Sequence, residues 1–265
     1  MANKSELNGR WALVTGASAG IGAELARELA GRGAKLILTA RRKERLEALA
    51  AELTARGTET RIVAADLNDR EAPQQIYDAT EGAGIAVDIL INNAGLGQFG
   101  AFYSTPMEQE LSQVRVNCEA VVHLTRLFVP RMVERKRGWV LVVASTASFQ
   151  PVPYLSTYAA TKVFDRFFAQ ALAAEVAQFG IKVTTLCPGP TESEFWEVSR
   201  ASAFKRKVQP AAEVAHLGIE ALVRGKRTII ANVEGRLTAF LVRFLPVSLI
   251  TNMVAKIAGR AAQAK

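Results

Sequence analysis

The sequence of 265 residues has few of the residues that build metal sites and disulfide scaffolds. It contains two cysteines, Cys118 and Cys187, and two histidines, His123 and His216. So few cysteines exclude a disulfide scaffold, and two histidines are too few for the usual imidazole metal site, so we expect no metal. Because the cysteines also lie far apart in the sequence, we expect reduced thiols and a cytoplasmic protein.

Long apolar runs and long basic runs are also missing. The first ten residues, MANKSELNGR, lack the apolar stretch of a signal peptide. No uninterrupted apolar run approaches the roughly 20 residues that a membrane-spanning helix needs. The formal net charge is +8, but no run of five basic residues occurs, so nucleic acid is not indicated as a partner. We expect a soluble protein or, at most, a peripheral membrane protein.

Short β-rich runs alternate with long helical patterns over most of the chain, 49% of which is hydrophobic. Several runs are apolar at nearly every position, which is typical of parallel strands covered on both faces. The alternation predicts an α/β fold: one doubly wound Rossmann-type domain over residues 1–265, with a mostly seven-stranded parallel sheet and helices on both faces. The predicted strands are 11–15, 36–39, 62–65, 87–91, 139–144, 181–186 and 228–231, and the predicted helices include 23–32, 42–56, 107–135 and 154–179.

A glycine-rich segment joins the first predicted strand to the first predicted helix. Gly16, Gly20 and Gly22 permit a tight turn that brings backbone N–H groups close to a phosphate. The positive end of the following helix also favours an anion. Taken alone, a glycine-rich turn is weak evidence, and an ordinary connection between a strand and a helix is the less favoured alternative.

A possible catalytic group lies in the second half of the chain. Tyr158 and Lys162 are four residues apart, which places them on one face of a helix. A phenol is a weak acid at neutral pH, and a nearby ammonium favours its ionised form. Ser145 follows an apolar strand, where sites in parallel sheets open, and its hydroxyl can polarise a substrate oxygen. Each residue alone has an ordinary structural explanation, but together they indicate acid–base chemistry.

These motifs resemble the classical short-chain dehydrogenase/reductase family from Arg10 to about Ser193. The matching segments include the glycine loop, Asn92-Asn93-Ala94-Gly95, and Pro188-Gly189. The resemblance implies that Asn117, Ser145, Tyr158 and Lys162 are catalytic, with Asn117 holding a water of the proton relay. For the cofactor it implies contacts from Gly16, Ser18, Gly20, Ile21, Gly22, Arg41, Asp66, Leu67, Asn93, Ala94, Gly95, Tyr158, Lys162, Pro188, Gly189, Thr191 and Ser193.

The end of the second predicted strand bears on the choice of dinucleotide. Ala40 stands where relatives that prefer NAD carry an aspartate, and Arg41 follows it. An arginine can form paired hydrogen bonds to a 2′-phosphate, so we expect NADP(H). However, Ala19 replaces a second basic residue common in NADP-preferring relatives, and Arg41 and Arg42 could instead begin a solvated helix. Asp66 resembles the adenine contact of the family, with a helix N-cap as the alternative.

Two segments near the carboxyl terminus point to the substrate. We expect residues 190–210 to form a variable substrate loop whose Phe195, Trp196 and Phe204 either close over an apolar substrate or pack on the domain. In the same loop, residues 205–207 are basic and could attract an acidic acyl carrier or simply be solvated.

The extension over residues 235–265 is amphipathic and basic. It has no acid after Glu234, and its apolar residues fall at helical spacing in two stripes separated by Pro246. We predict a helical segment that contributes to an apolar substrate entrance or an oligomer contact, with weak membrane association as the less favoured outcome. The first stripe is Leu237, Phe240, Leu241, Phe244 and Leu245, the second is Ile250, Met253, Val254 and Ile257, and the basic residues are Arg236, Arg243, Lys256, Arg260 and Lys265.

The resemblance implies an NADP(H)-dependent oxidoreductase that transfers a hydride between the nicotinamide and a carbonyl or alcohol carbon. The partner is then a small-molecule carbonyl or alcohol substrate, and we expect a homo-oligomer, a dimer or a tetramer. One alternative is a 3-oxoacyl-thioester reductase acting on coenzyme A or acyl-carrier-protein substrates. An alternative of another class is a dinucleotide-binding sensor without catalysis.

Overall fold

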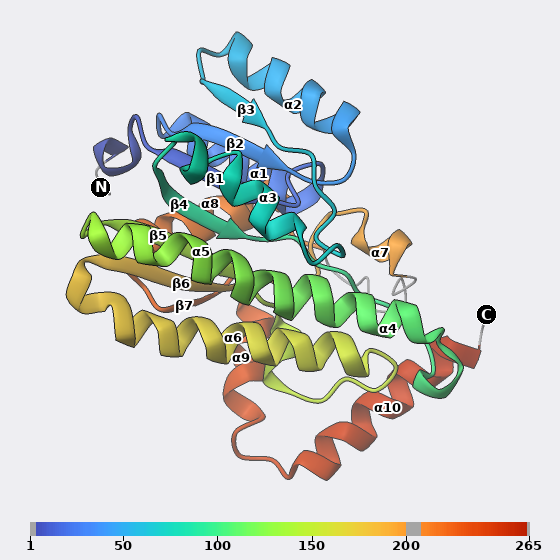
Figure 1. Ribbon diagram of the computed structural model, residues 1–265. Coiled ribbons are helices and arrows are strands. Elements are labelled where there is room, and N and C mark those ends of the chain that lie inside the picture. Colours follow the sequence, from blue (N-terminus) through green and yellow to red (C-terminus); the bar gives the residue numbers. More distant parts are fainter. Residues whose placement is uncertain (1–3, 200–207, 264–265) are drawn as a thin grey trace.

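The computed structural model describes residues 4–199 and 208–263. Within these residues the structure has one sheet of seven parallel strands in the order β3-β2-β1-β4-β5-β6-β7 (Figure 1). The predicted doubly wound sheet is therefore confirmed. The strands are β1 (Trp11–Thr15), β2 (Lys35–Thr39), β3 (Thr60–Ile62), β4 (Val87–Asn92), β5 (Gly138–Val143), β6 (Ile181–Cys187) and β7 (Thr228–Ile230).

Helices cover both faces of this sheet. Apolar side chains of α1, α2 and α8 pack on one face, and those of α3, α5 and α6 pack on the other. The central strands β4 and β5 are consequently buried at every position, which explains why their sequences are apolar throughout. The helices are α1 (Gly20–Gly31), α2 (Lys43–Ala55), α3 (Ala72–Asp78), α4 (Met107–Val114), α5 (Ala120–Glu134), α6 (Ser156–Val176), α7 (Phe195–Val198), α8 (Ala211–Val223), α9 (Val233–Leu241) and α10 (Val247–Gln263).

Two elements differ from the sequence-based prediction. The helix predicted over 107–135 is divided by a π-helical turn at Arg115–Glu119, because an extra residue is accommodated there. The third strand lies at Thr60–Ile62 rather than at 62–65. The chain nevertheless stays paired to β2 beyond that strand, since Val63 N donates to Leu38 O at 3.0 Å.

Phe128 of α5 provides a test of the core between the sheet and its helices. Its side chain is fully buried and meets the Tyr77 ring edge to face at 5.5 Å. We expect Phe128→Ala to lower the free energy of unfolding by about 3–5 kcal/mol, because the helix cannot collapse fully into the cavity left behind. Tyr103→Ala, at a residue that is 93% exposed, should change it little. Denaturant unfolding of both variants measures the difference, and equal losses would contradict this packing.

Candidate active site

A cavity of about 600 Å³ opens where the carboxyl ends of β1, β4, β5 and β6 meet. This is the edge where open parallel sheets bind ligands. All residues predicted from the sequence to contact the cofactor line this cavity, and so does Ser145. Asn117 does not line it. Val254 of α10, which the sequence analysis placed in the second apolar stripe, and Thr238 of α9, which it did not name, also form part of its wall.

The glycine loop forms the end of the cavity next to β1. Gly16 and Gly20 adopt left-handed backbone conformations, with φ of 66° and 54°. At Gly22 a Cβ atom would lie 2.2 Å from the carbonyl oxygen of Gly16, so only glycine fits. Ala19 precedes α1 without a side-chain cap, which leaves the first N–H groups of the helix available to a ligand. The loop therefore fits the diphosphate of a dinucleotide.

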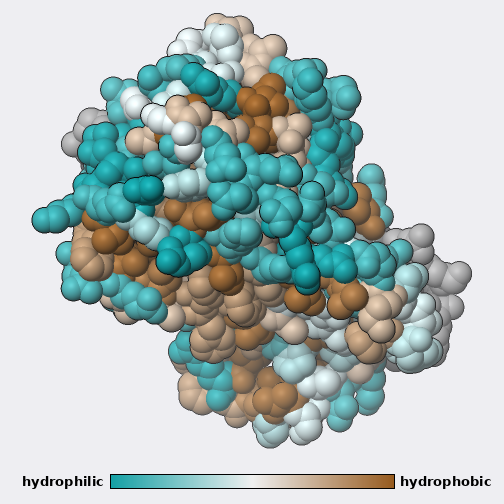
Figure 2. Space-filling model, viewed as in Figure 1, coloured by the Kyte–Doolittle hydropathy of each residue, from teal (hydrophilic) through white to brown (hydrophobic). Residues whose placement is uncertain are grey.

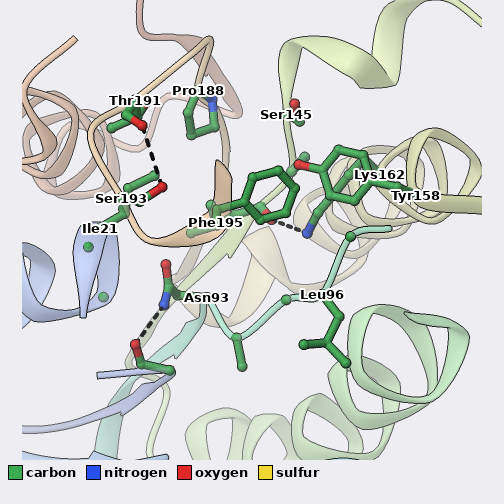
Figure 3. A pocket seen from close by; sticks show the side chains of 18 of the residues that line it. Ile21, Asn93, Leu96, Ser145, Tyr158, Lys162, Pro188, Thr191, Ser193 and Phe195 are labelled. Carbon is green, nitrogen blue, oxygen red and sulfur yellow. Dashed lines mark hydrogen bonds between the residues drawn. The ribbon is translucent and has the colours of Figure 1, made fainter. Parts of the chain in front are cut away.

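Asn93 fastens this loop to the neighbouring strand. Its side-chain amide donates to the carbonyl oxygen of Thr15 at 2.8 Å and to that of Gly16 at 3.4 Å, the second bond being the one drawn in Figure 3. The buried hydroxyl of Thr15 donates to Ile91 O at 3.0 Å and accepts hydrogen bonds from the backbone N–H groups of Asn93 and Ala94. These bonds hold the ends of β1 and β4 together and so form this wall of the cavity.

Basic side chains gather where β2 ends. Arg42 donates to Ser18 Oγ at 3.1 Å and to Glu194 at 2.6 Å, and Arg45 also donates to Glu194. Arg41 lies half-exposed 4.0 Å from Asp66. The sequence analysis named Arg41 for the cofactor but missed the links that Arg42 and Arg45 make to the loop after β6.

Asp66 lies beside these arginines on the cavity wall. Its Oδ1 accepts a hydrogen bond from Asn68 N at 3.0 Å, and the next helix begins only at Ala72. The alternative interpretation of Asp66 as a helix N-cap is therefore wrong. Its carboxylate instead accepts a hydrogen bond within the turn that follows β3, and it lines the cavity.

Two hydroxyl groups lie on the opposite side of the cavity. The Tyr158 hydroxyl, on α6, points toward the side chain of Ser145, which follows β5 (Figure 3). Ser145 Oγ accepts a hydrogen bond from Ala147 N at 3.1 Å, which orients it. The ring of Phe195 lies 5.2 Å from that of Tyr158, centroid to centroid, and covers it from the side of the loop after β6.

Lys162 lies one helical turn beyond Tyr158 and is almost completely buried. Its Nζ donates to the carbonyl oxygen of Val143 at 2.9 Å and to Asp165 Oδ2 at 2.9 Å. The same Nζ lies 6.0 Å from the centroid of the Tyr158 ring. Burial alone would lower the pKa of Lys162, but the charge of Asp165 and the hydrogen bond to it outweigh burial and raise this pKa above its usual value.

Asp165 was missed by the sequence analysis. Its side chain is 1% exposed, and its Oδ1 makes no hydrogen bond within residues 4–199 and 208–263. A buried carboxylate with one free oxygen is costly unless a charge compensates it, and Lys162 does so. The available signal was its position three residues after Lys162, on the same helix face.

Asn117 lies in the π-helical turn, where its side chain is fully buried. Its Oδ1 accepts a hydrogen bond from Leu96 N at 2.8 Å, and its Nδ2 donates to Leu96 O and to Thr161 Oγ1 at 2.8 and 2.9 Å. Thr161 in turn donates to the carbonyl oxygen of Tyr158. The Asn117 side chain therefore connects the segment after β4 to α6 rather than facing the cavity.

The loop after β6 closes the remaining side. Thr191 Oγ1 donates to Gly189 O at 3.0 Å, and Ser193 Oγ donates to Thr191 O at 3.4 Å (Figure 3). The indole of Trp196 also donates to Thr191 O, at 2.7 Å, so this aromatic residue is held in the wall. Phe204 and the basic residues 205–207 lie outside the described residues.

Comparisons with known proteins agree with this geometry. A family model described as short chain dehydrogenase matches residues 10–203. The very-long-chain 3-oxoacyl-CoA reductase of Anas platyrhynchos is 33% identical over 231 residues, which cover 82% of this chain and 72% of that protein. Hydroxysteroid dehydrogenase-like protein 1 of Gallus gallus is 36% identical over 225 residues, covering 83% of this chain and 67% of that protein.

A solved structure matches as well. The short-chain dehydrogenase from Sphingobium yanoikuyae, in complex with NADPH, superposes with a TM-score of 0.80 and 32% sequence identity, covering 89% of this chain and 96% of that one. The family model spans most of the present chain, and its motifs converge on one cavity. The chain therefore belongs to the short-chain dehydrogenase/reductase family.

Proposed function

We propose that the protein is an NADP(H)-dependent oxidoreductase that interconverts a carbonyl and an alcohol on an apolar substrate. The observation that carries the proposal is the convergence of Ser145, Tyr158 and Lys162 on the cavity that the glycine loop also lines. A nicotinamide dinucleotide is the cofactor, and when bound it supplies or accepts the hydride at the substrate carbon. A sensor without catalysis would have no need for this set of hydroxyls and a buried ammonium.

Tyr158 and Ser145 act on the substrate oxygen in this proposal. Both hydroxyls donate hydrogen bonds to a carbonyl oxygen, which polarises the carbonyl carbon. When the carbonyl carbon of the substrate gains the hydride, Tyr158 donates its proton to the carbonyl oxygen, and the product is the alcohol. The tyrosine is left as a phenolate, and it regains a proton before the next turnover. In the oxidative direction the same groups act in reverse.

Lys162 stabilises that phenolate, and Asp165 positions Lys162. Two N–H groups of the ammonium are committed to Val143 O and Asp165, so a third remains for a hydroxyl in the cavity, such as a ribose hydroxyl. We assign Asn117 a positioning role, because its amide holds Leu96 and Thr161 rather than facing the cavity. The other residues predicted from the sequence to contact the cofactor keep that role in the proposal.

Preference for NADP(H) is supported by the charge at the end of β2. Arg41 and Arg42 line the cavity, and Ala40 supplies no acid for a ribose 2′-hydroxyl. Glu194 already partners Arg42, so Arg41 is the more available cation for a 2′-phosphate. The complex of the Sphingobium yanoikuyae relative with NADPH is consistent with this preference.

An apolar substrate is supported by the side chains around Tyr158. Val152, Leu155, Phe195, Trp196 and Val254 line the cavity there. A 3-oxoacyl thioester is the second candidate, because the relative from Anas platyrhynchos is named as a 3-oxoacyl-CoA reductase. We further propose that residues 190–210 act as the substrate loop and residues 235–265 as an extension of a single domain.

We also propose a cytoplasmic homo-oligomer, either a dimer or a tetramer. Exposed apolar side chains on α4 and α6 support a contact between copies of the chain, since monomers rarely leave such patches uncovered. These residues are Met107, Leu111, Val114, Phe164 and Phe167.

Removing the phenol tests the proton donor. We expect Tyr158→Phe to lower kcat roughly 10²–10⁴-fold, because only the transferable proton is lost. The Kd for NADPH should stay near that of the wild type, whereas Lys162→Ala should weaken both binding and turnover. Tyr154→Phe is the matched control, because Tyr154 does not line the cavity. Near-normal kcat in Tyr158→Phe would rule out its role as the acid.

Neutralising Asp165 tests the positioning of Lys162. In Asp165→Asn the pKa of Lys162 should fall, because the charge that raises it is gone. The ammonium is then lost at a lower pH, so the alkaline limb of the kcat/KM profile should shift toward lower pH. Asp165→Glu should largely restore the limb, and Glu175→Gln on the exposed side of α6 should not move it. A uniform loss at every pH would instead indicate a purely structural role.

Cofactor preference is tested at Arg41. We expect Arg41→Ala to weaken NADPH binding by roughly 1.5–3 kcal/mol while affecting NADH little, because a charge-assisted hydrogen bond to the 2′-phosphate is lost. Lys43→Ala is the control, because this neighbouring lysine pairs with Glu47 and does not line the cavity. Fluorescence titration with both cofactors measures the effect. Equal weakening of NADPH and NADH, or a wild-type preference for NADH, would refute the assignment.

A further inference from the structure

We propose that α9, α10 and the connection between them form a surface that docks on an anionic lipid bilayer. This α9–α10 surface consists of Val233 and the exposed side chains of residues 236–257. In Figure 1 the two helices project from the lower end of the molecule, away from the sheet. Figure 2 shows hydrophobic side chains gathered over the same lobe.

The orientation of α9 is the first observation. A helix that packs on a core normally turns its large apolar side chains inward. Here the buried residues are the small Gly235 and Ala239, whereas Phe240 and Phe244 are 57% and 71% exposed. The two phenyl rings pack edge to face at 5.2 Å. Val233, Leu237 and Leu241 extend the same outward stripe.

On α10 only part of the apolar surface is covered. Ile250 and Ala258 are buried against the rest of the protein. Leu249, Met253 and Ile257, which lie at intervals of four residues, form a second exposed stripe. A soluble monomer rarely leaves two adjoining stripes of this kind in water, so a partner with an apolar interior is required.

The positive charge of the surface indicates which kind of partner covers it. The sequence has no acid after Glu234, and Arg236, Arg243 and Lys256 are exposed at the borders of the apolar stripes. Pairing this face with a second copy would bring charges of one sign together across the interface. An anionic bilayer instead accepts apolar side chains between its headgroups while the headgroups neutralise the basic residues.

The docking is peripheral. Within residues 4–199 and 208–263, no helix combines the length and the hydrophobicity needed to cross a membrane. The apolar stripes are instead carried by helices whose opposite faces contact the protein.

The same helices border the cavity. Thr238 of α9 and Val254 of α10 line it, and each is next in sequence to an exposed apolar residue of the docking surface, Leu237 and Met253. Docking would therefore bring the wall of the cavity close to the hydrocarbon, where an apolar substrate dissolves. This last consequence rests on the proposed function, whereas the docking itself does not.

Cosedimentation of the full chain with vesicles tests the proposal without any turnover. We expect binding to vesicles of phosphatidylcholine and phosphatidylglycerol, and much weaker binding to phosphatidylcholine alone. The double variant Phe240→Ser/Phe244→Ser should bind the mixed vesicles about tenfold less or weaker still, because apolar burial is lost. Removing charge in Arg243→Gln/Lys256→Gln should weaken binding about fivefold for each charge.

Matched controls distinguish binding through this surface from nonspecific binding of the protein to vesicles. Val122→Ser changes an exposed apolar side chain on α5, 39% exposed, which lies outside the α9–α10 surface and is not among the residues proposed for the contact between copies. Arg126→Gln/Lys226→Gln removes two exposed charges from α5 and the segment after α8. Both controls should bind vesicles like the wild type. Thermal unfolding followed by circular dichroism establishes that each variant is folded.

Three results would overturn the proposal. One is equal binding to both kinds of vesicle, or to neither. Another is an equal loss of binding in Val122→Ser and in the Phe240 and Phe244 variant. The third is a fall in the sedimentation mass of that variant in the absence of lipid, which would make the α9–α10 surface an interface between copies of this chain.

Discussion

The Lys162 ammonium is buried, and a buried charge must be given partners by the fold. Val143, the last residue of β5, supplies a carbonyl oxygen, and Asp165 supplies a carboxylate one helical turn further along α6. The bond to Val143 ties the central sheet to α6 at the place where the chain also presents Ser145 and Tyr158, and the bond to Asp165 balances the charge within α6. The arrangement requires the parallel sheet, because only the shared carboxyl edge brings the ends of β1, β4 and β5 to one cavity.

Much of the fold and of the site follows from local sequence patterns. The apolar strands, the glycine loop and the pair Tyr158 and Lys162 depend on short-range spacing, which is visible in one sequence. The π-helical turn at Asn117 could not be predicted, because it depends on how that side chain is bound by Leu96 and Thr161 from other segments. The spacing of three residues between Lys162 and Asp165 is visible in the sequence and indicates that they can pair. That both side chains are buried follows only from the way α6 packs on the sheet.

The carboxyl-terminal helices show a different limit. The spacing of apolar residues predicts a stripe on α9, but periodicity alone does not say whether the stripe faces the core or the solvent. Gly235 faces inward so closely that a Cβ atom would lie 2.6 Å from Thr146 and 3.0 Å from Ile230, and Ala239 is buried on the same helix. The large apolar residues are thereby left outside. As a result, α9 carries a residue of the cavity wall, Thr238, on one side and a hydrophobic surface on the other. The proposed catalytic chemistry does not require that hydrophobic surface.

Transfer of deuterium tests most directly whether this cavity catalyses hydride transfer. The protein would be incubated with NADPH deuterated at C4 of the nicotinamide and a panel of apolar ketones, aldehydes and 3-oxoacyl thioesters, and the products analysed by mass spectrometry. The account predicts an alcohol that carries deuterium on the former carbonyl carbon, formed by the wild type and hardly at all by Tyr158→Phe. Tight NADPH binding without deuterium transfer to any of these substrates would contradict it and would favour a dinucleotide-binding sensor.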